Sequence, residues 1–186
     1  MLYLITGGSK CGKSRIAEDI IMKYEKKRYY IATMEPFGEE AQAAIARHQS
    51  MRAGKGFETI ECYRDVGSLV LKESDEMASA HEAYDPRGCV ALLECMGNLC
   101  ANEMFSPSGV QTGVVEKLIS DIAKLYEQME HLVIVTNQVG ADGIEYPKET
   151  MQYMANLGKI NAALAGMADV VVEAVYGIPV VLKGEM

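Results

Sequence analysis

The chain begins with LYLITGGSKCGKSRIAEDIIMKY (residues 2–24), and this stretch decides the fold. A strand-like apolar run leads into a glycine-rich segment, and residues with helical spacing follow it. The segment between them matches G-x-x-x-x-G-K-[ST], with both glycines, the lysine and the serine in register. This order predicts a phosphate-binding loop, because backbone N–H groups at the start of a helix can turn inward around phosphate oxygens.

Each residue type in the loop has its own task. The glycines allow the tight turn, the lysine neutralises phosphate charge, and the serine offers its hydroxyl to Mg²⁺. We therefore predict that the loop binds a nucleoside triphosphate, ATP or GTP, together with Mg²⁺. The motif alone does not choose between a kinase, an ATPase and a switch. The candidate binding residues are Gly7, Gly8, Ser9, Lys10, Cys11, Gly12, Lys13 and Ser14.

A second candidate lies in LLECMGN (residues 92–98), where an acidic residue follows a strand-like run. A carboxylate at the end of a buried strand beside a phosphate loop can hold the metal, usually through water. Glu94 fits this role together with Ser14. The alternative is that Glu94 is a strand-end carboxylate in a structural hydrogen bond.

The rest of the chain alternates apolar runs with segments of helical period. The runs are mostly apolar throughout, as expected for parallel strands covered on both faces. They occupy residues 2–6, 29–33, 89–95, 131–137 and 169–183, and helical segments are expected at 14–27, 39–52 and 114–129. We predict an α/β, P-loop NTPase-like fold whose mostly parallel sheet has helices on both faces. Gly177 and Pro179 predict that the last run turns back as a hairpin.

Length and composition limit the possible classes. The 186 residues fit one domain, residues 1–186, and the polar segment 72–88 reads as a solvated helix and loop. No apolar run approaches the roughly 20 residues of a membrane span. A strand at the very N-terminus leaves no room for a secretory signal, which predicts a cytoplasmic protein. The net charge of -8 argues against nucleic acid and anionic lipid as partners.

The cysteines predict reduced thiols. Their number is odd and none of their spacings is C-x-x-C, so neither a disulfide framework nor a cysteine zinc site is expected. They are Cys11, Cys62, Cys89, Cys95 and Cys100.

Several further segments carry a resemblance to a known family. YYIATMEP, AIARHQSMR, ETIEC, LLEC, NLCANEMF, VTNQVG and GKINAALAGMADVVVEAVYGIPVVLKG come in that order. From Leu4 to Lys183, the chain resembles the bifunctional adenosylcobinamide kinase/adenosylcobinamide-phosphate guanylyltransferases of cobalamin biosynthesis. This resemblance implies phosphorylation of the aminopropanol hydroxyl of adenosylcobinamide, followed by transfer of GMP from GTP to the new phosphate. It also implies a corrinoid as the other substrate and a homo-oligomer, a trimer.

The resemblance implies roles for three further residues. His48 is the residue that would carry GMP, and Lys13 of the phosphate loop is the other expected catalytic residue. Arg52 would meet phosphate and Glu61 would accept hydrogen bonds from guanine or ribose. Histidine is mostly neutral near pH 7, so a ring nitrogen can attack an α-phosphate. Taken alone, His48 and Arg52 are solvated helix residues, and Glu61 is a charge at a strand end.

Two polar groups near the strand ends match the family as well. Asn102 lies on the helix after a strand and is either a site residue or a packing and capping group. Thr136 and Asn137 close a buried strand at the edge where such sheets bind ligands. Their alternative role is local hydrogen bonding to the backbone.

The chain also departs from the family pattern. Gln138 stands where the family has a glutamate, and Gly97 and Asn98 stand where it has threonines. In the stretch TMQYMANLGKINAALA (residues 150–165), the arginines and other polar groups of the family are replaced by Met151, Met154, Ala155 and Ala162. The phosphate loop and His48 are intact, so these changes bear on the kinase step rather than on nucleotide binding.

Two explanations of the methionines remain open. Met151, Met154 and Met167 would form an apolar face against the core or a neighbouring subunit, or the substrate would be a different one.

Two other functions remain open. One is a small-molecule kinase without nucleotidyl transfer, which would form no covalent intermediate. The other is a nucleotide-binding regulator that has lost catalysis, which would bind nucleotide tightly with negligible turnover.

Overall fold

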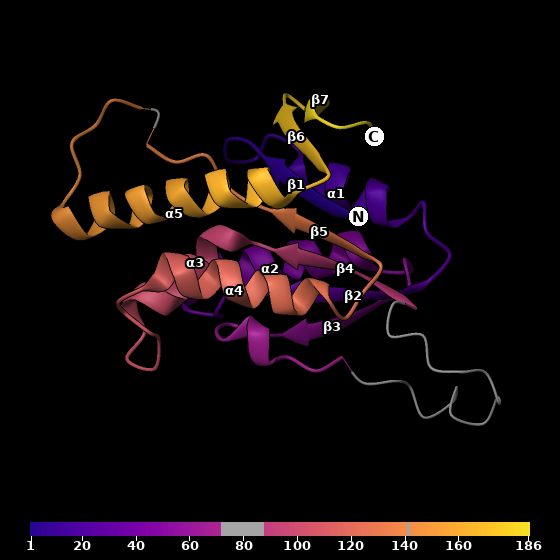
Figure 1. Ribbon diagram of the computed structural model, residues 1–186, viewed down its shortest axis with the longest axis horizontal. Helices are drawn as coiled ribbons and strands as arrows, with labels where there is room; N and C mark the ends of the chain where they lie inside the picture. Colours follow the sequence, from indigo (N-terminus) through magenta and orange to yellow (C-terminus); the bar gives the residue numbers. More distant parts are fainter. Residues whose placement is uncertain (72–87, 141) are drawn as a thin grey trace.

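A single twisted sheet organises the molecule (Figure 1). The computed structural model describes residues 1–71, 88–140 and 142–186. In these residues the sheet has the strand order β3-β2-β4-β5-β1-β6-β7. The strands are β1 (Leu2–Thr6), β2 (Lys27–Ala32), β3 (Phe57–Glu61), β4 (Cys89–Glu94), β5 (His131–Val135), β6 (Val170–Val175) and β7 (Ile178–Lys183).

All neighbouring strands except the last pair run parallel, as the apolar runs predicted. Leu4 of β1, for example, lies between Ile134 of β5 and Val171 of β6. The central strands are buried on both faces, which explains why their sequences do not alternate between apolar and polar residues. Their carboxyl ends therefore meet at one edge of the sheet.

Helices cover both faces of the sheet, as predicted. They are α1 (Lys13–Ile21), α2 (Gly38–Arg52), the short 3₁₀ helix η1 (Val66–Ser68), α3 (Met96–Phe105), α4 (Val114–Tyr126) and α5 (Lys148–Met167). Helix α1 packs on one face through Ile16 and Ile20. Helices α3, α4 and α5 pack on the other, where Leu99, Leu118 and Leu164 belong to one buried cluster. The C-terminal hairpin is β6–β7, with Tyr176 and Gly177 at its turn.

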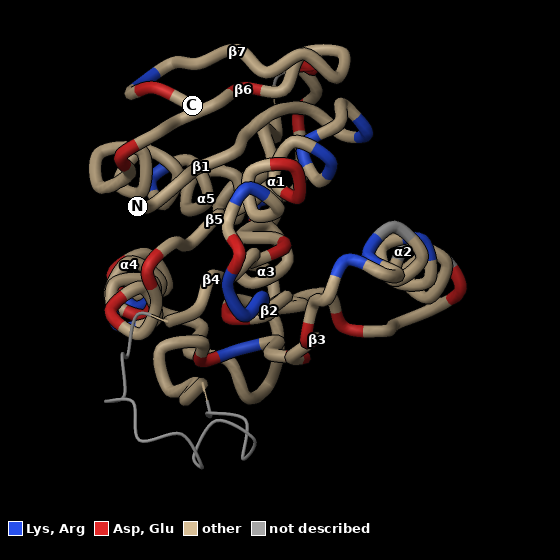
Figure 2. The backbone as a smooth tube through the Cα atoms, turned by 90° about the vertical axis from the view of Figure 1, so that its right-hand side faces the viewer, with Lys and Arg blue, Asp and Glu red and all other residues tan. Residues whose placement is uncertain are grey.

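Helix α2 differs from the others because it stands beside the sheet, away from the packed core (Figure 2). Its sequence is Ala-rich but has no continuous apolar stripe. Gly38 at its start and Gly54 just beyond its end both have positive φ angles, of 75° and 78°. These are turns that a residue with a side chain adopts with strain.

One expected helix is shorter than its sequence pattern. Helix α1 was predicted over residues 14–27, but it ends at Ile21 and β2 already begins at Lys27. Tyr24 has the correct helical spacing, yet it lies in the connecting turn. Its ring stacks on His131 with the centroids 3.9 Å apart, and its hydroxyl is 2.6 Å from that of Tyr3. Tyr24 therefore packs within the connecting turn instead of extending the helix.

The described residues do not include most of the polar segment at 72–88. The helix and loop predicted at 72–88 lie outside the described residues apart from residue 88. Within the described part, no helix combines the length and the apolar character needed to cross a membrane.

Candidate active site

A cavity of about 790 Å³ lies between α2, the phosphate loop and the carboxyl ends of β2, β3 and β4. This volume is in the range of small-molecule sites, about 300 to 1,000 Å³. Of the predicted residues, these line it: Ser9, Lys10, Cys11, Gly12, Lys13, Ser14, His48, Arg52, Glu61 and Glu94. The structure thus brings residues from four separate segments of the chain to one place.

The predicted residues Gly7 and Gly8 do not line the cavity but shape the loop around it. Gly7 has a φ of 142°, and a Cβ there would lie 2.8 Å from the carbonyl oxygen of Ala174. Gly12 has a φ of 98°, and its Cβ would lie 3.0 Å from the Cα of Gly177. Both positions therefore need glycine, because the loop packs directly against the end of β6 and the hairpin turn. The N–H of Gly177 also donates a 2.8 Å hydrogen bond to the carbonyl of Cys11.

Lys13 directs its ammonium group into the loop. The side chain is buried, and Nζ donates hydrogen bonds to the carbonyls of Gly7, at 3.0 Å, and of Gly8. The group lies at the first residue of α1, where the helix dipole is also positive. A buried cation at a helix N-terminus, beside inward-turned backbone, is suited to bind phosphate.

Glu94 ends β4 and connects two neighbouring segments. Its Oε1 accepts a hydrogen bond from the hydroxyl of Ser14, and its Oε2 accepts one from the hydroxyl of Tyr30 at 3.0 Å. A serine hydroxyl and a carboxylate side by side are the hard oxygen ligands that Mg²⁺ prefers. The described residues contain no cluster of three or more His, Cys, Asp or Glu able to hold an ion alone.

His48 reaches this group from α2. Its Nδ1 lies 3.5 Å from Oε2 of Glu94, a distance that is long for a hydrogen bond, and this nitrogen has no other partner. The structure separates His48 from the other described histidine, His131. His131 lies at the start of β5, at the amino ends of the strands and away from the cavity. Its Nδ1 is 3.0 Å from the N-terminal amine. His81 lies outside the described residues.

Arg52 is a buried cation that faces the cavity. Its guanidinium carbon lies 3.3 Å from the ring centroid of Tyr30, and Nη1 has no hydrogen-bond partner. Only 7% of the residue is exposed. Burying a charged donor without a partner is costly, so this arrangement is suited to an incoming anion. The sequence alone gave no sign of this burial.

Glu61 lies at the far wall of the cavity, at the end of β3. The hydroxyl of Tyr63 donates a 2.7 Å hydrogen bond to its Oε2. This bond, together with partial burial, raises the pKa of Tyr63 to about 12, so the phenol stays a donor at neutral pH. Glu61 is exposed enough to accept hydrogen bonds from a ligand, as the prediction requires.

The three polar residues with uncertain roles fall into two groups. Asn102 donates hydrogen bonds to the carbonyls of Thr33, at 2.8 Å, and Tyr63, at 2.9 Å, and so it connects loops behind the cavity. Thr136 is fully buried and donates to Asn161 at 2.6 Å. These contacts support the packing role for Asn102. Thr136 bonds a side chain of α5 rather than the local backbone, and Asn137 lines the cavity.

Most of the residues that depart from the family pattern lie on α5 or, like Gly97, contact it. A side chain at Gly97 would lie 3.1 Å from both the amide of Asn137 and the hydroxyl of Tyr153. Glycine there leaves room for Tyr153, which donates a 3.2 Å hydrogen bond to the carbonyl of Gly97. The amide of Gln138 donates to Glu173 at 2.9 Å.

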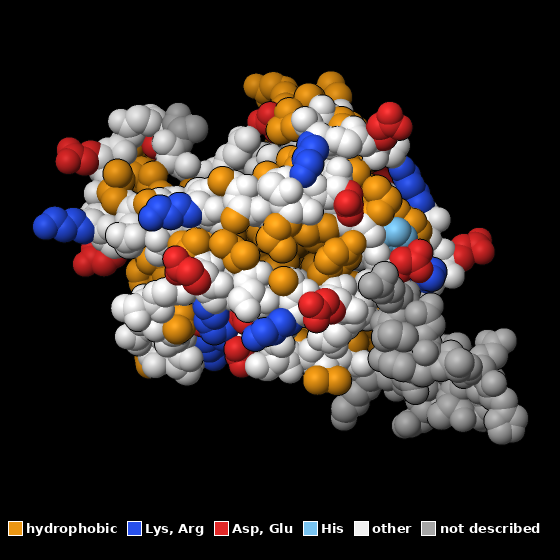
Figure 3. Space-filling view, in the orientation of Figure 1, with side chains coloured by type: hydrophobic (Ala, Val, Ile, Leu, Met, Phe, Trp, Pro, Cys, Tyr) orange, Lys and Arg blue, Asp and Glu red, His pale blue; other side chains and the backbone are white. Residues whose placement is uncertain are grey.

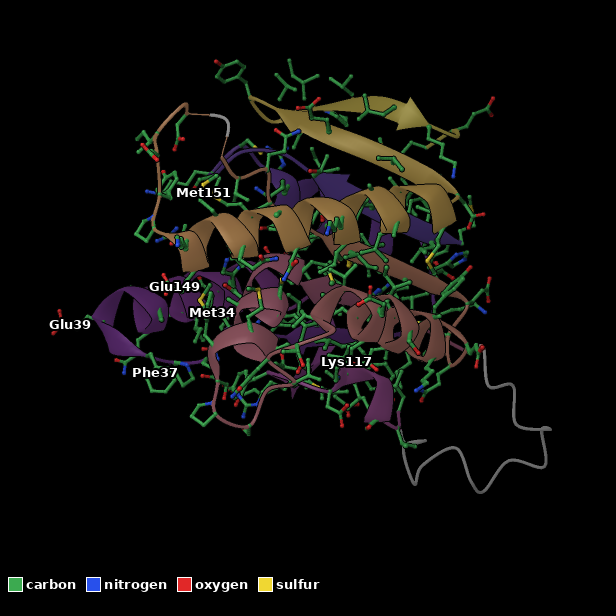
Figure 4. The ribbon with its side chains drawn as sticks, turned by 60° about the vertical axis from the view of Figure 1, so that its left-hand side comes forward. Met34, Phe37, Glu39, Lys117, Glu149 and Met151 are labelled. Carbon is green, nitrogen blue, oxygen red and sulfur yellow. The ribbon has the colours of Figure 1, made fainter. Side chains whose placement is uncertain are left out.

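The methionines do not form one buried face. Met151, near the start of α5, and Met167, at its end, are 47% and 41% exposed (Figure 4). Met154 is half-buried and lies beside Gly140, where a Cβ would lie 2.2 Å from its Cε. Met151 and Met167 therefore do not belong to the core.

Tyr30 is a site residue that the sequence did not indicate. It occupies the YYIAT strand, where an aromatic residue looks like ordinary core. Yet it lines the cavity and contacts both Arg52 and Glu94. The only sequence signal available was its place near the carboxyl end of a central strand.

The chain is similar to a known protein family over nearly its whole length. Residues 3–182 match the family described as cobinamide kinase / cobinamide phosphate guanyltransferase. The bifunctional adenosylcobalamin biosynthesis protein CobU of Salmonella typhimurium is 30% identical, covering 98% of this chain and 100% of that protein. The bifunctional adenosylcobalamin biosynthesis protein CobP of Pseudomonas aeruginosa is 25% identical, covering 100% of this chain and 99% of its own.

A solved structure from Pyrococcus horikoshii shares the fold. The TM-score is 0.52 at 9% identity, and the match covers 100% of this chain and 87% of that one. At this identity the similarity concerns the fold alone.

Proposed function

Since this chain belongs to the cobinamide kinase / cobinamide phosphate guanyltransferase family, we propose that it carries out both reactions in the one cavity. It phosphorylates the hydroxyl of adenosylcobinamide and then transfers GMP from GTP to the resulting phosphate through His48. The observation that carries the proposal is that His48 lies within 3.5 Å of Glu94, which itself contacts Ser14 of the phosphate loop. A nucleotide whose phosphates lie in the loop would therefore meet His48.

Different residues of the cavity bind the phosphates, the metal and the nucleoside. The loop backbone and Lys13 bind the phosphates, and Arg52 binds phosphate from the side of α2. Ser14 and Glu94 would hold Mg²⁺, which supplies positive charge to the phosphate oxygens. Glu61 accepts hydrogen bonds from guanine or ribose at the far wall. In the kinase step the γ-phosphate leaves for the acceptor hydroxyl, and in the transfer step the α-phosphate is attacked by His48.

The nucleotide is GTP for the transfer step and ATP or GTP for the kinase step, and the corrinoid is the other substrate. We propose that the working form is a homo-oligomer, a trimer as the family resemblance implies. Exposed apolar side chains on the C-terminal hairpin support self-association.

Labelled GTP tests the role of His48. The protein is incubated with Mg²⁺ and GTP labelled at the α-phosphate, and the label on the protein is measured after acid and after alkali treatment. We expect an acid-labile, alkali-stable label, as a phosphoramidate gives, and its complete loss in His48→Ala. Gln42→Ala, an exposed position on the same helix that does not line the cavity, is the matched control and should label like the wild type.

Two other results would point to a different function. No label on a protein that transfers the γ-phosphate to adenosylcobinamide would leave a kinase without nucleotidyl transfer. No label and no transfer, with GTP binding intact by calorimetry, would leave a nucleotide-binding protein without catalysis.

A further inference from the structure

The carboxylate of Glu94 faces three side chains at once. Its Oε1 is occupied by the hydroxyl of Ser14, on the side of the phosphate loop. Its Oε2 accepts a hydrogen bond from Tyr30 and lies 3.5 Å from Nδ1 of His48. The side chain of Glu94 is only 10% exposed and that of His48 only 23%. Little water can therefore compete for the contact between them.

The geometry distinguishes the two ring nitrogens of His48. Nδ1 is buried without a hydrogen-bond partner, and Oε2 of Glu94 is the acceptor within reach of it. A neutral imidazole donates from one nitrogen and has a free lone pair on the other, and the partner of the first nitrogen decides which is which. Distances of this kind often shorten when substrate binds.

We propose that Glu94 is a positioning residue for guanylyl transfer: it accepts a hydrogen bond from Nδ1–H of His48 and so presents Nε2 as the atom that attacks GTP. Tyr30 holds Glu94 in place for this task. The proposal deepens the function given above, on which it rests, by assigning the attacking atom and the two residues that select it.

Tyr30 is suited to this supporting role. Its hydroxyl donates a 3.0 Å hydrogen bond to Oε2 of Glu94, the same oxygen that faces Nδ1 of His48. The face of the same ring carries Arg52 at 3.3 Å. One tyrosine therefore fixes both the carboxylate behind the histidine and the guanidinium that would meet phosphate.

Transfer of GMP through His48 takes place in two steps. Nε2 of His48 attacks the α-phosphorus, the N–P bond forms, and the P–O bond to the β-phosphate breaks, so pyrophosphate leaves with that electron pair. The ring then carries a positive charge, which its Nδ1–H shares with Glu94. In the second step an oxygen of the acceptor phosphate attacks the same phosphorus. The N–P bond breaks, its electron pair returns to Nε2, and His48 is again the neutral Nδ1–H form.

The ¹⁵N spectrum of the histidine rings tests the assignment without any turnover. Protein with labelled histidine is measured free of metal and nucleotide, at a pH where the ring is neutral, and His48→Ala identifies the His48 signals. We expect the Nδ1–H tautomer in the wild type, although the neutral histidine side chain in water prefers the proton on Nε2. The Nε2–H tautomer in the wild-type protein would overturn the proposal.

Two variants test which residues impose the tautomer. Glu94→Gln removes the charge and should shift His48 toward Nε2–H. Tyr30→Phe keeps the ring under Arg52 but removes the hydroxyl, and should shift it part of the way. Glu58→Gln removes an exposed carboxylate of β3 that does not line the cavity, and should change nothing. An unchanged tautomer in folded Glu94→Gln would also overturn the proposal.

The covalent form provides a second readout. The ³¹P shift of the guanylylated protein should indicate attachment at Nε2, and the rate of labelling should fall roughly 10- to 100-fold in Glu94→Gln and less in Tyr30→Phe. Attachment at Nδ1 would refute this inference but not the proposed function. Absence of any label on His48, with the tautomer as expected, would refute the proposed function but not the role of Glu94 in orienting the ring.

Discussion

At the scale of single residues, Arg52 shows how function and stability oppose each other. Its guanidinium is buried against Tyr30, and one of its nitrogens has no partner in the protein. The stacking recovers part of the cost of burial, on the order of 1 kcal/mol. An anion bound to the guanidinium would offset the remaining free-energy cost of burying Arg52.

We therefore expect Arg52→Met to weaken nucleotide binding without lowering the melting temperature. Hydrogen bonds to charged groups contribute about 1.5 to 3 kcal/mol, so the Kd for GTP should rise roughly 10- to 150-fold. Titration calorimetry measures the first effect and a thermal melt of the nucleotide-free protein the second. Lys23→Met, an exposed substitution beyond the end of α1, is the control and should leave both unchanged. A folded Arg52→Met protein with wild-type affinity would remove Arg52 from the binding site.

At the scale of elements, one lysine joins three of them. Lys117 on α4 contacts Asp65 beside η1 at 3.0 Å, Glu103 on α3 at 2.9 Å, and Asp121 one turn further along α4 (Figure 4). Glu103 is almost fully buried and also accepts hydrogen bonds from the backbone N–H groups of Asp65 and Val110. The cluster fixes α3, which begins at Met96, two residues after Glu94, relative to α4.

Acid should loosen this cluster. Burial alone would raise the pKa of Glu103, but its hydrogen bonds and Lys117 outweigh burial and lower the pKa below its ordinary value. The carboxylate therefore stabilises the fold above its ordinary pKa of 4.5, and this contribution is lost as the pH falls through the lower folded value. Glu103→Gln should cost about 1 to 3 kcal/mol at pH 7 and should flatten the loss of stability between pH 5 and pH 3.

Urea unfolding at several pH values measures this prediction. Glu116→Gln, an exposed carboxyl in the first turn of α4, is the matched control and should follow the wild-type profile. The prediction fails if Glu103→Gln loses as much stability on acidification as the wild type does.

Helices and strands also show why some elements could be predicted from sequence and others could not. The central strands β1, β4 and β5 are buried on both faces, so their apolar runs identify them. Strand β3 lies at the sheet edge, and only Phe57 and Ile60 of its residues are partly buried, which leaves no apolar run. Helix α1 carries an apolar pattern as far as Tyr24, but the packing of that tyrosine on His131 depends on a residue more than 100 positions away.

The same contrast applies to the site. The phosphate loop and Glu94 follow from local patterns, because strand, loop and helix must adjoin in sequence. The grouping of His48, Arg52 and Glu61 with the loop needed a family resemblance, since α2 has no apolar stripe to indicate its orientation. The part played by Tyr30 could not be predicted, because it depends on a side chain stacked on it from another element.

At the scale of the whole molecule, the C-terminal hairpin is the most conspicuous surface. Strand β7 forms the sheet edge, and hydrophobic side chains gather where it lies at the top of the molecule (Figure 3). Tyr176, Ile178 and Leu182 are 95%, 64% and 58% exposed. An exposed edge strand with apolar side chains tends to pair with another chain.

We expect the protein to be a homo-oligomer that uses this hairpin, and light scattering after size exclusion should give a mass above that of one chain. The double substitution Ile178→Asp/Leu182→Asp should lower the mass toward 20.4 kDa. Phe37→Asp changes an apolar residue that is even more exposed, at 79%, but lies beside α2, and it should not lower the mass. A wild-type protein that is monomeric at tens of micromolar would contradict the expectation.

The hydrogen bond between Gly177 and Cys11 connects this surface to the nucleotide site. It joins the turn of that hairpin to the phosphate loop, so whatever fixes the hairpin also restrains the loop that must close around a triphosphate. Assembly and ligand binding would share one coupling free energy, and each would strengthen the other by the same factor. Dilution would then lower the apparent affinity for nucleotide, and nucleotide would drive subunits together.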